Sequence, residues 1–232
     1  MQEYILNIET STNVCSAAIS AGERILAFRE SMEGPSHAAM LTVFIGDIMK
    51  ETGLDTGSLS AVAVSGGPGS YTGLRIGVSA AKGICYAADL PLIAVNSLAV
   101  MTQMVISSPD HRVNGRLLCP MIDARRMEVY TAVFNAAGEQ QSEIKAEIIN
   151  EETFRDVCHD NKLLIFGNGA LKCRNLLNHP NIEFKPGIYP SARMMGSLSH
   201  KALIDRKFES TAYFTPFYLK DFVATTPRKK IF

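Results

Sequence analysis

The chain has 232 residues, of which 47% are apolar and 20% charged, and its 23 basic and 23 acidic residues give a net charge of zero. This composition is typical of a folded globular protein with one large domain or two small ones, and it excludes disordered and fibrous classes. A neutral chain has no overall electrostatic attraction to nucleic acid. No stretch approaches the roughly 20 apolar residues of a membrane helix, and the N-terminal segment lacks the basic start of a signal peptide.

The five cysteines are odd in number and form no CxxC motif. Cys15 and Cys85 lie in apolar stretches, where a free thiol behaves as a small hydrophobic group. This usage favours a reducing compartment. The composition therefore predicts a cytoplasmic protein, either an enzyme or a subunit of a complex.

In chain order, the first half reads as three short strands followed by alternating helices and strands. The predicted elements are strands 4–10, 14–20 and 24–30, helix 36–51, strand 59–66, helix 71–88, strand 92–97 and helix 97–106. The first helix has start signals at Pro35 and Ser36, and Gly53 follows its end.

The second half repeats this order without sequence identity to the first. Its predicted elements are strands 116–123, 127–134 and 142–150, helix 151–158, strand 162–168, helix 170–178, strand 182–188 and helix 191–204. Three antiparallel strands followed by alternating helices and strands, present twice, form the arrangement of the actin-like ATPase domain (ASKHA, ribonuclease H-like) fold. We therefore expect an α/β protein with two βββαβαβα lobes that face a cleft.

The boundary between the lobes is expected in the loop 107–115, which is polar and rich in helix- and strand-breaking residues. This gives an N-terminal lobe at 1–106 and a smaller C-terminal lobe at 107–232. The last helix and the tail of the second lobe are expected to pack back on the first. The basic run Arg228–Lys230 in that tail is interpreted as solvated.

The glycine-rich segment SGGPGSYTGLRIGVSAAKG, residues 65–83, connects a predicted strand to a predicted helix. Such a turn can bind an anion at the helix N-terminus, but this one lacks the Gly-Lys-Ser/Thr of a Walker loop and the pattern of the dinucleotide fingerprint. Gly73 and Gly77 lie one turn apart inside the helix, where each glycine costs about 1 kcal/mol relative to alanine. Close packing against another backbone, within the chain or across an interface, is favoured over ligand binding.

The helix at 36–51 has apolar residues around about two thirds of its circumference, more than one sheet can cover. This excess favours a partner helix from another chain. A helix fully inside its own chain would show the same pattern.

Four segments together resemble the TsaB (YeaZ) family: IETST near the first hairpin, GPGSYTGLRIG, MIDARRMEVY and PFYLKDFVA. The resemblance runs through essentially the whole chain. It implies a cytoplasmic, non-catalytic scaffold subunit of the machinery that transfers threonylcarbamoyl to adenosine in tRNA. Its implied partners are the catalytic paralogue TsaD and, through that complex, the ATPase TsaE. Contact with tRNA is expected to be indirect or weak.

The resemblance also implies self-association through the helix pair 36–51 and 71–88, with TsaD binding at the same surface. The chain alone would then be a homodimer. The predicted interface residues are His37, Met40, Leu41, Phe44, Ile48, Gly73, Arg75, Gly77 and Lys82.

No catalytic residue, metal or cofactor is predicted. The catalytic paralogue binds its metal through a His-xxx-His pair, but here His37 is followed by Leu41 at the second position, and one imidazole cannot make that site. The other histidines are scattered singly. No GxSxG elbow is present for serine hydrolysis.

Two acidic residues, Glu9 and Asp123, each end the first strand of a half, and the fold would place them across the cleft from each other. They could hold a divalent cation, or they could be turn residues. The vestigial nucleotide cleft would comprise Glu9, Thr10, Ser11, Asp123, Gly167 and Gly169. The alternative function is therefore a weak nucleotide hydrolase, or a metallopeptidase of the M22 (glycoprotease-like) type, on the same fold.

Overall fold

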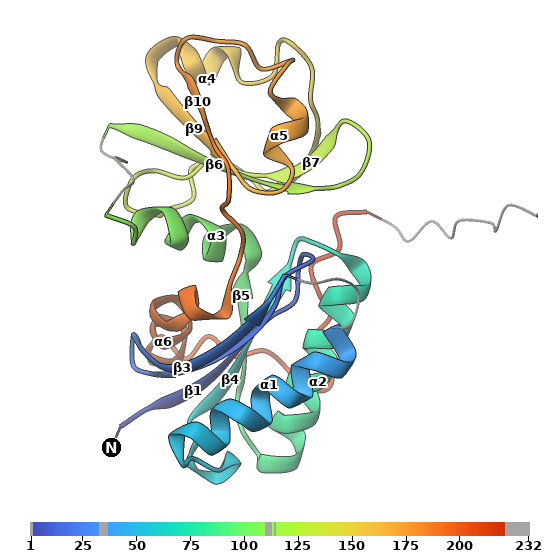
Figure 1. Cartoon of the computed structure of the whole chain (residues 1–232), viewed down its shortest axis with the longest axis vertical. Helices are drawn as coiled ribbons and strands as arrows, with labels where there is room; N and C mark the ends of the chain where they lie inside the picture. The colour runs from blue at the N-terminus through green and yellow to red at the C-terminus, as the bar shows by residue number, and fades with distance from the viewer. Residues whose placement is uncertain (1, 33–36, 110–112, 114, 221–232) are drawn as a thin grey trace, which may run out of the picture.

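A computed structural model describes residues 2–32, 37–109, 113 and 115–220. The chain forms two lobes, one above the other in Figure 1, each built around a five-stranded sheet. The first sheet has the order β3-β2-β1-β4-β5. Its strands are β1 (Tyr4–Glu9), β2 (Cys15–Ala21), β3 (Arg24–Ser31), β4 (Ala61–Gly67) and β5 (Leu92–Asn96). Strands β1, β2 and β3 are antiparallel neighbours, whereas β4 pairs parallel with β1 and β5.

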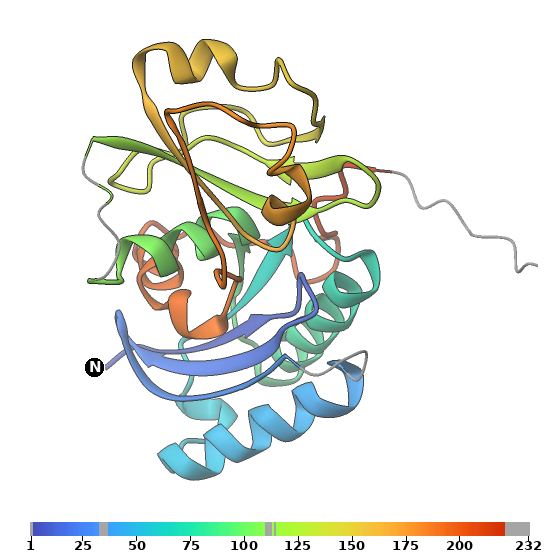
Figure 2. The same cartoon turned by 45° about the horizontal axis from the view of Figure 1, so that its top comes forward.

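Two long helices cover the face of this sheet that points away from the second lobe, as Figure 2 shows. Helix α1 (His37–Thr52) packs on β2 and β3, and helix α2 (Tyr71–Ala88) packs on β4. A short 3-10 turn, η1 (Thr56–Ser58), follows α1. The side chain of Ser70 caps α2 by accepting a hydrogen bond from the amide of Gly73 at 3.3 Å. The helix ends at Asp89, which has a left-handed conformation with φ of 51°.

The second sheet has the order β10-β9-β6-β7-β8, which repeats the connectivity of the first sheet. Its strands are β6 (Arg116–Asp123), β7 (Glu128–Thr131), β8 (Lys145–Ile148), β9 (Lys162–Phe166) and β10 (Ile182–Lys185). Its helices are α4 (Arg155–Asp160) and α5 (Ala170–Cys173). The predicted α/β fold of the actin-like type is confirmed by this repeated strand order.

Several elements of the second half are shorter than predicted. Helix α4 begins only at Arg155, because Phe154 before it adopts φ of 68° and breaks the helical path. Helix α5 has four residues instead of the predicted nine. The predicted helix 191–204 is divided into a 3-10 turn, η2 (Ala192–Met194), and helix α6 (Gly196–Ile204).

Helices from each half pack on the sheet of the other half. Helix α3 (Ser97–Ile106) follows β5 but shares an apolar core with β6 and β9, through residues such as Met101 and Leu118. Helix α6 follows the second lobe in sequence but packs on the first sheet, where Met195 and Leu198 contact the cluster around Ile5. Figure 1 shows α3 between the two sheets and α6 beside β3. The lobe boundary at 106/107 stays a prediction.

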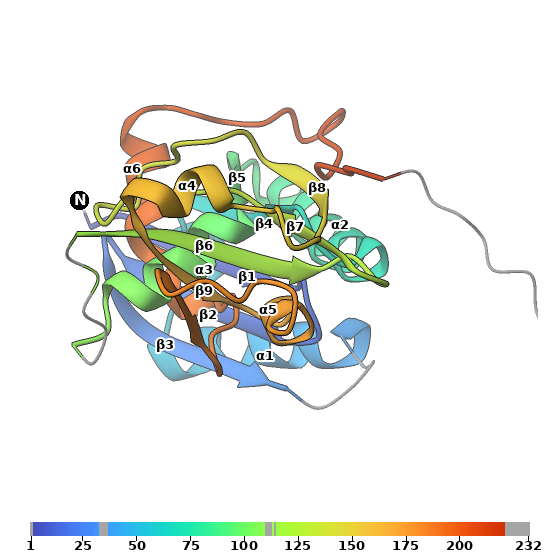
Figure 3. The same cartoon turned by 90° about the horizontal axis from the view of Figure 1, so that it is seen from above.

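The C-terminal segment, residues 205–220, follows α6. It runs along one side of the molecule toward α2, as seen from above in Figure 3. Glu209 forms a β-bridge with Leu92 at the edge of the first sheet, and the amide of Phe217 donates to the carbonyl of Gly66 at 2.7 Å. The basic run predicted at 228–230 and the start signals Pro35 and Ser36 lie outside the described residues. Among the described helices, none has the length and apolar character needed to cross a membrane.

Candidate partner-binding groove and buried polar cluster

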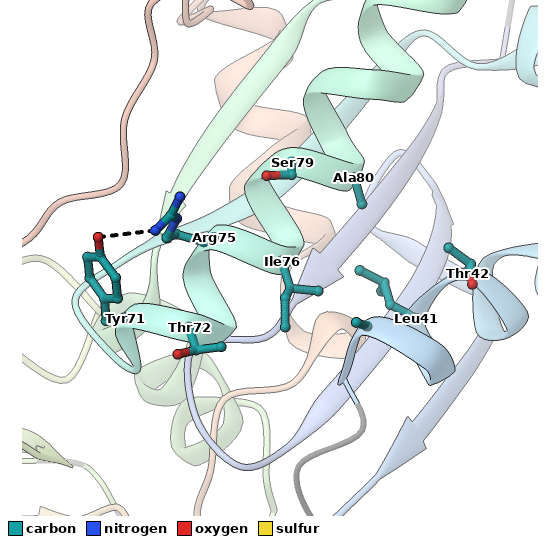
Figure 4. A pocket seen from close by; sticks show the side chains of 9 residues that line it. Leu41, Thr42, Tyr71, Thr72, Arg75, Ile76, Ser79 and Ala80 are labelled. Atoms are coloured by element: carbon teal, nitrogen blue, oxygen red, sulfur yellow. Dashed lines mark hydrogen bonds between the residues drawn. The ribbon is translucent and has the colours of Figure 1, made fainter. Parts of the chain in front are cut away.

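A groove of about 450 Å³ lies between α1 and α2 on the outer face of the first lobe. Figure 4 shows side chains from both helices pointing into it. It is lined by Ala38, Leu41, Thr42, Tyr71, Thr72, Arg75, Ile76, Ser79 and Ala80. Leu41, Ile76 and Ala80 give the groove apolar walls, and it is open to solvent along its length.

One end of the groove carries a polar and aromatic cluster. The guanidinium of Arg75 donates to the hydroxyl of Tyr71 at 3.3 Å and lies 5.4 Å from the centre of its ring. The ring of Tyr218, from the C-terminal segment, stands 5.0 Å from that of Tyr71. Arg75 is thereby held at the rim of the groove, where it can donate to a docked partner.

The predicted interface residues on α1 divide into two groups. Leu41 and Ile48 are buried in the core of the first lobe, at 1% and 0% exposure, so the free surface they were expected to supply is small. Met40 and Phe44 are half-buried and pack against that core with part of each side chain accessible. Val43, which was not predicted, is more than half exposed.

Gly73 and Gly77 are packed inside the chain. A Cβ atom at Gly73 would lie 2.1 Å from the carbonyl oxygen of Thr10, and one at Gly77 would lie 2.3 Å from the Thr10 hydroxyl. The Thr10 hydroxyl donates to the carbonyl of Gly73 at 2.8 Å. The close backbone approach that the two glycines predicted therefore exists, and its partner in this structure is the loop after β1.

Lys82, also predicted at the interface, binds the C-terminal segment of its own chain. Its ammonium donates to the carbonyls of Ala212 at 3.0 Å and Phe214 at 3.2 Å. The same segment and the C-terminal ends of β4 and β5 line a second, open pocket of about 550 Å³.

His37 is buried at the start of α1, with its Nε2 atom 3.3 Å from the carbonyl oxygen of Val14. Leu41 stands one turn further along the helix. Across the described residues, no three His, Cys, Asp or Glu side chains come together in a way that could hold a metal ion. In this structure His37 therefore fixes the helix start against β2.

The predicted nucleotide-site residues of the first lobe form a sealed polar cluster. Glu9, Thr10 and Ser11 all have zero exposure. The carboxylate of Glu9 accepts from the amide of Ser11 at 2.6 Å, and its second oxygen has no partner among the described residues. Burial raises the pKa of the Glu9 carboxyl above its ordinary value, because the charged form loses its hydration.

The glycine-rich turn covers this cluster. A Cβ at Gly69 would lie 2.2 Å from the carbonyl oxygen of Ser11, and the Ser11 carbonyl accepts from the amide of Ser70 at 2.6 Å. The hydroxyl of Ser11 has no partner in the described part of the chain. The glycine-rich turn therefore packs directly on Ser11 and helps to bury the polar cluster.

The second-lobe residues of the predicted cleft have different surroundings. Asp123 is exposed and forms an ion pair with Lys172, and its carboxylate accepts from the amide of Arg125 at 2.9 Å. Gly167 has φ of 106°, and Gly169 packs on the backbone of β6. These two glycines allow the β9–α5 turn to lie against its own sheet.

Sequence reasoning predicted the helix pair and Arg75, but it missed the other α2 residues that line the groove and the aromatic contact at its end. Thr72, Ile76 and Ala80 share one face of α2 by their spacing of four residues, which is a signal that the sequence contained. The contact of Tyr71 with Tyr218 joins residues far apart in sequence, and no local pattern indicates it.

The duplicated strand order defines an actin-like α/β protein, with an open groove on the outer face of its first lobe. The profile of the family described as "TsaD: tRNA N6-adenosine threonylcarbamoyltransferase" matches residues 32–227. The chain is 29% identical over 231 residues to the tRNA threonylcarbamoyladenosine biosynthesis protein TsaB of Escherichia coli, covering 95% of this chain and 96% of that protein.

Solved structures of known proteins have the same fold as this chain. YeaZ from Pseudomonas aeruginosa superimposes with a TM-score of 0.78 at 25% identity, covering 94% of this chain and 100% of that chain. The activator of 2-hydroxyisocaproyl-CoA dehydratase from Clostridium difficile, with bound ADPNP, superimposes with a TM-score of 0.50 at 10% identity, over 89% and 97% of the two chains. That likeness shows the fold alone. The chain belongs to the TsaD family and, within it, to the TsaB (YeaZ) group.

Proposed function

We propose that this protein is a non-catalytic scaffold subunit in the synthesis of threonylcarbamoyladenosine in tRNA, and that it binds the catalytic subunit TsaD through the α1–α2 groove. The role in this pathway rests on membership of the TsaB group, whose members are named for it. The observation that carries the scaffold role is the open groove, with apolar walls from two long helices and Arg75 at its rim.

The chemistry of the groove fits a protein partner. Its centre is apolar where Leu41, Ile76 and Ala80 meet, and its rim is polar, with the hydroxyls of Thr42, Thr72 and Ser79. An apolar centre with a polar rim is the usual anatomy of a protein interface. Met40, Phe44 and Val43 extend the apolar surface along α1.

The sealed polar cluster supports the non-catalytic part of the proposal. Glu9 has zero exposure, and the turn with Gly69 lies directly on Ser11, so the chain would have to open before a nucleotide could reach them. Asp123 is neutralised by Lys172 at the surface. A hydrolase of this fold would require acids that reach metal and water.

The same groove accounts for the proposed assemblies. A homodimer of the chain alone would bury two copies of this surface against each other, and TsaD would replace one copy in the working complex. TsaE would join through the TsaB–TsaD pair.

Size-exclusion chromatography with light scattering, on the chain alone and mixed with TsaD, tests the proposal. Ser79→Arg would place a long cation in the groove from an exposed position on α2 and should abolish the heterodimer while leaving the fold intact. Ile204→Arg is the matched control, because Ile204 is exposed on α6 at the opposite face of the first sheet. A heterodimer that survives Ser79→Arg would contradict the proposed surface.

A further inference from the structure

The hairpin between β6 and β7 has two consecutive arginines in an unfavourable backbone conformation. Arg125 has φ of 68° and Arg126 has φ of 50°. Positive φ brings Cβ close to the backbone and is common only for glycine, asparagine and aspartate. Both arginines are exposed, so no packing of their side chains explains their presence.

The surroundings hold this hairpin in place. The amide of Ala124 donates to the carbonyl of Glu128 at 3.1 Å, and the amide of Glu128 donates to the carbonyl of Arg125 at 3.2 Å. The ammonium of Lys172 donates to the carbonyls of Arg126 and Glu128, each at 2.7 Å. The two guanidinium groups therefore project from a well-anchored tip.

The two carboxylates of the hairpin are paired with lysines, Asp123 with Lys172 and Glu128 with Lys220. Within the described residues, neither Arg125 nor Arg126 takes part in a salt bridge. The hairpin residues 123–128 therefore carry two arginine charges that no salt bridge among the described residues pairs.

The tip lies on the same side of the molecule as the N-terminal end of α2 (Figures 1 and 3). The C-terminal segment connects the two places, since Tyr218 contacts Tyr71 and Lys220 pairs with Glu128. A ligand at the hairpin would therefore lie beyond the polar end of the groove, within reach of a partner docked there.

We propose that Arg125 and Arg126 bind backbone phosphates of the tRNA substrate. Guanidinium groups match phosphate geometry with paired hydrogen bonds, and phosphate contacts position an RNA without reading its sequence. This inference rests on the proposed function for its choice of RNA. Of the two expected forms of contact with tRNA, indirect or weak, it selects a weak, direct contact at Arg125 and Arg126.

The test is fluorescence anisotropy with an end-labelled tRNA transcript, titrated with the chain at low and at physiological salt. Arg125→Asn/Arg126→Asn removes both charges and keeps a residue that tolerates positive φ, so the variant should melt at the wild-type temperature. Its affinity for tRNA at low salt should fall about tenfold, and the slope of log K against log salt should decrease by about 1 to 2. Arg125→Lys/Arg126→Lys should retain most of the salt-dependent affinity.

Lys201→Ala/Lys207→Ala is the control for charge. It also removes two positive charges, but both lysines pair with Asp205 at the end of α6. This variant should bind tRNA like the wild type. If the asparagine variant also keeps full affinity, or if the wild type does not bind tRNA at low salt, the inference is wrong. Loss of partner binding with tRNA affinity intact would assign the arginines to an acidic protein surface and overturn it as well.

The inference and the proposed function fail separately. A chain that pairs with TsaD while its asparagine variant keeps full tRNA affinity contradicts only the phosphate site. A chain that does not pair with TsaD contradicts the scaffold role.

Discussion

Glu9 ends strand β1 in the interior of the first lobe. Its carboxyl is fully buried, one oxygen accepts from the Ser11 amide, and burial raises its pKa. A raised pKa in the folded state means that folding favours the protonated form. Keeping the Glu9 carboxylate charged in its buried site lowers the stability of the fold. This loss is absent at pH values below the ordinary pKa of 4.5, and it grows as the pH rises toward the pKa in the folded protein.

Glu9→Gln should therefore make the protein more stable at neutral pH, because the amide is neutral at every pH and can still accept from the Ser11 amide. Each unit of difference between the pKa of Glu9 in the folded and unfolded chain corresponds to about 1.4 kcal/mol in the free energy of unfolding. Urea unfolding at pH 4.5 and pH 8 measures the difference, with Glu151→Gln on the surface as control. An equal effect of Glu9→Gln at both pH values would contradict the assignment.

Substitution of Gly73 tests whether the small residues of α2 are needed for packing inside the chain. Gly73→Ala would place a methyl group 2.1 Å from the Thr10 carbonyl oxygen, and should lower the free energy of unfolding by about 3 kcal/mol. Gly83→Ala, on the same helix, meets nothing within 4 Å and should raise it by about 0.5–1 kcal/mol. Thermal unfolding of both variants measures this contrast. Similar small effects would mean that the close packing at Thr10 is unimportant.

At the scale of elements, helix α2 was predicted with the observed bounds of 71–88, and helix α3 with the observed 97–106. Strong local signals explain this accuracy: Ser70 and Asn96 cap the two helix starts with side-chain hydrogen bonds. The element bounds of the second lobe were predicted less accurately, because its helices and strands are short. Helix α5 has four residues, too few for a helical pattern to identify its end.

The candidate site was predicted only in part, for a similar reason. Spacing along a helix shows which residues share a face, but not what covers that face. Gly73 and Thr10 are 63 positions apart in the chain, and their contact is not visible to any local pattern. Lys82 likewise binds carbonyls 130 and 132 residues away.

The C-terminal segment should depend on Lys82. Lys82→Met removes the two hydrogen bonds from its ammonium to the carbonyls of Ala212 and Phe214. A hydrogen bond to a charged group contributes roughly 1.5–3 kcal/mol to stability when it is buried, and less at this partly exposed site. The Phe217 amide, bonded to Gly66, should then exchange its hydrogen about tenfold faster. Mass-spectrometric hydrogen exchange with Lys50→Met as control would detect this. Unchanged protection would show that the other contacts of the segment, such as the Glu209–Leu92 bridge and the Tyr218–Tyr71 ring contact, hold it without Lys82.

At the scale of the whole molecule, the two halves have the same strand order and no sequence identity. The order of elements was therefore sufficient to predict the duplicated actin-like fold. The crossed packing of α3 and α6 joins the lobes through two shared apolar cores. In this account the second lobe supports the first and carries the β6–β7 hairpin with Arg125 and Arg126. Helices α1 and α2 of the first lobe bind the partner.

The most direct test of this account is light scattering coupled to size-exclusion chromatography on an equimolar mixture with TsaD. The account predicts a heterodimer for the wild type and for Ile204→Arg, and separate proteins for Ser79→Arg. A wild-type chain that elutes apart from TsaD, or a Ser79→Arg variant that still forms the heterodimer, would contradict it.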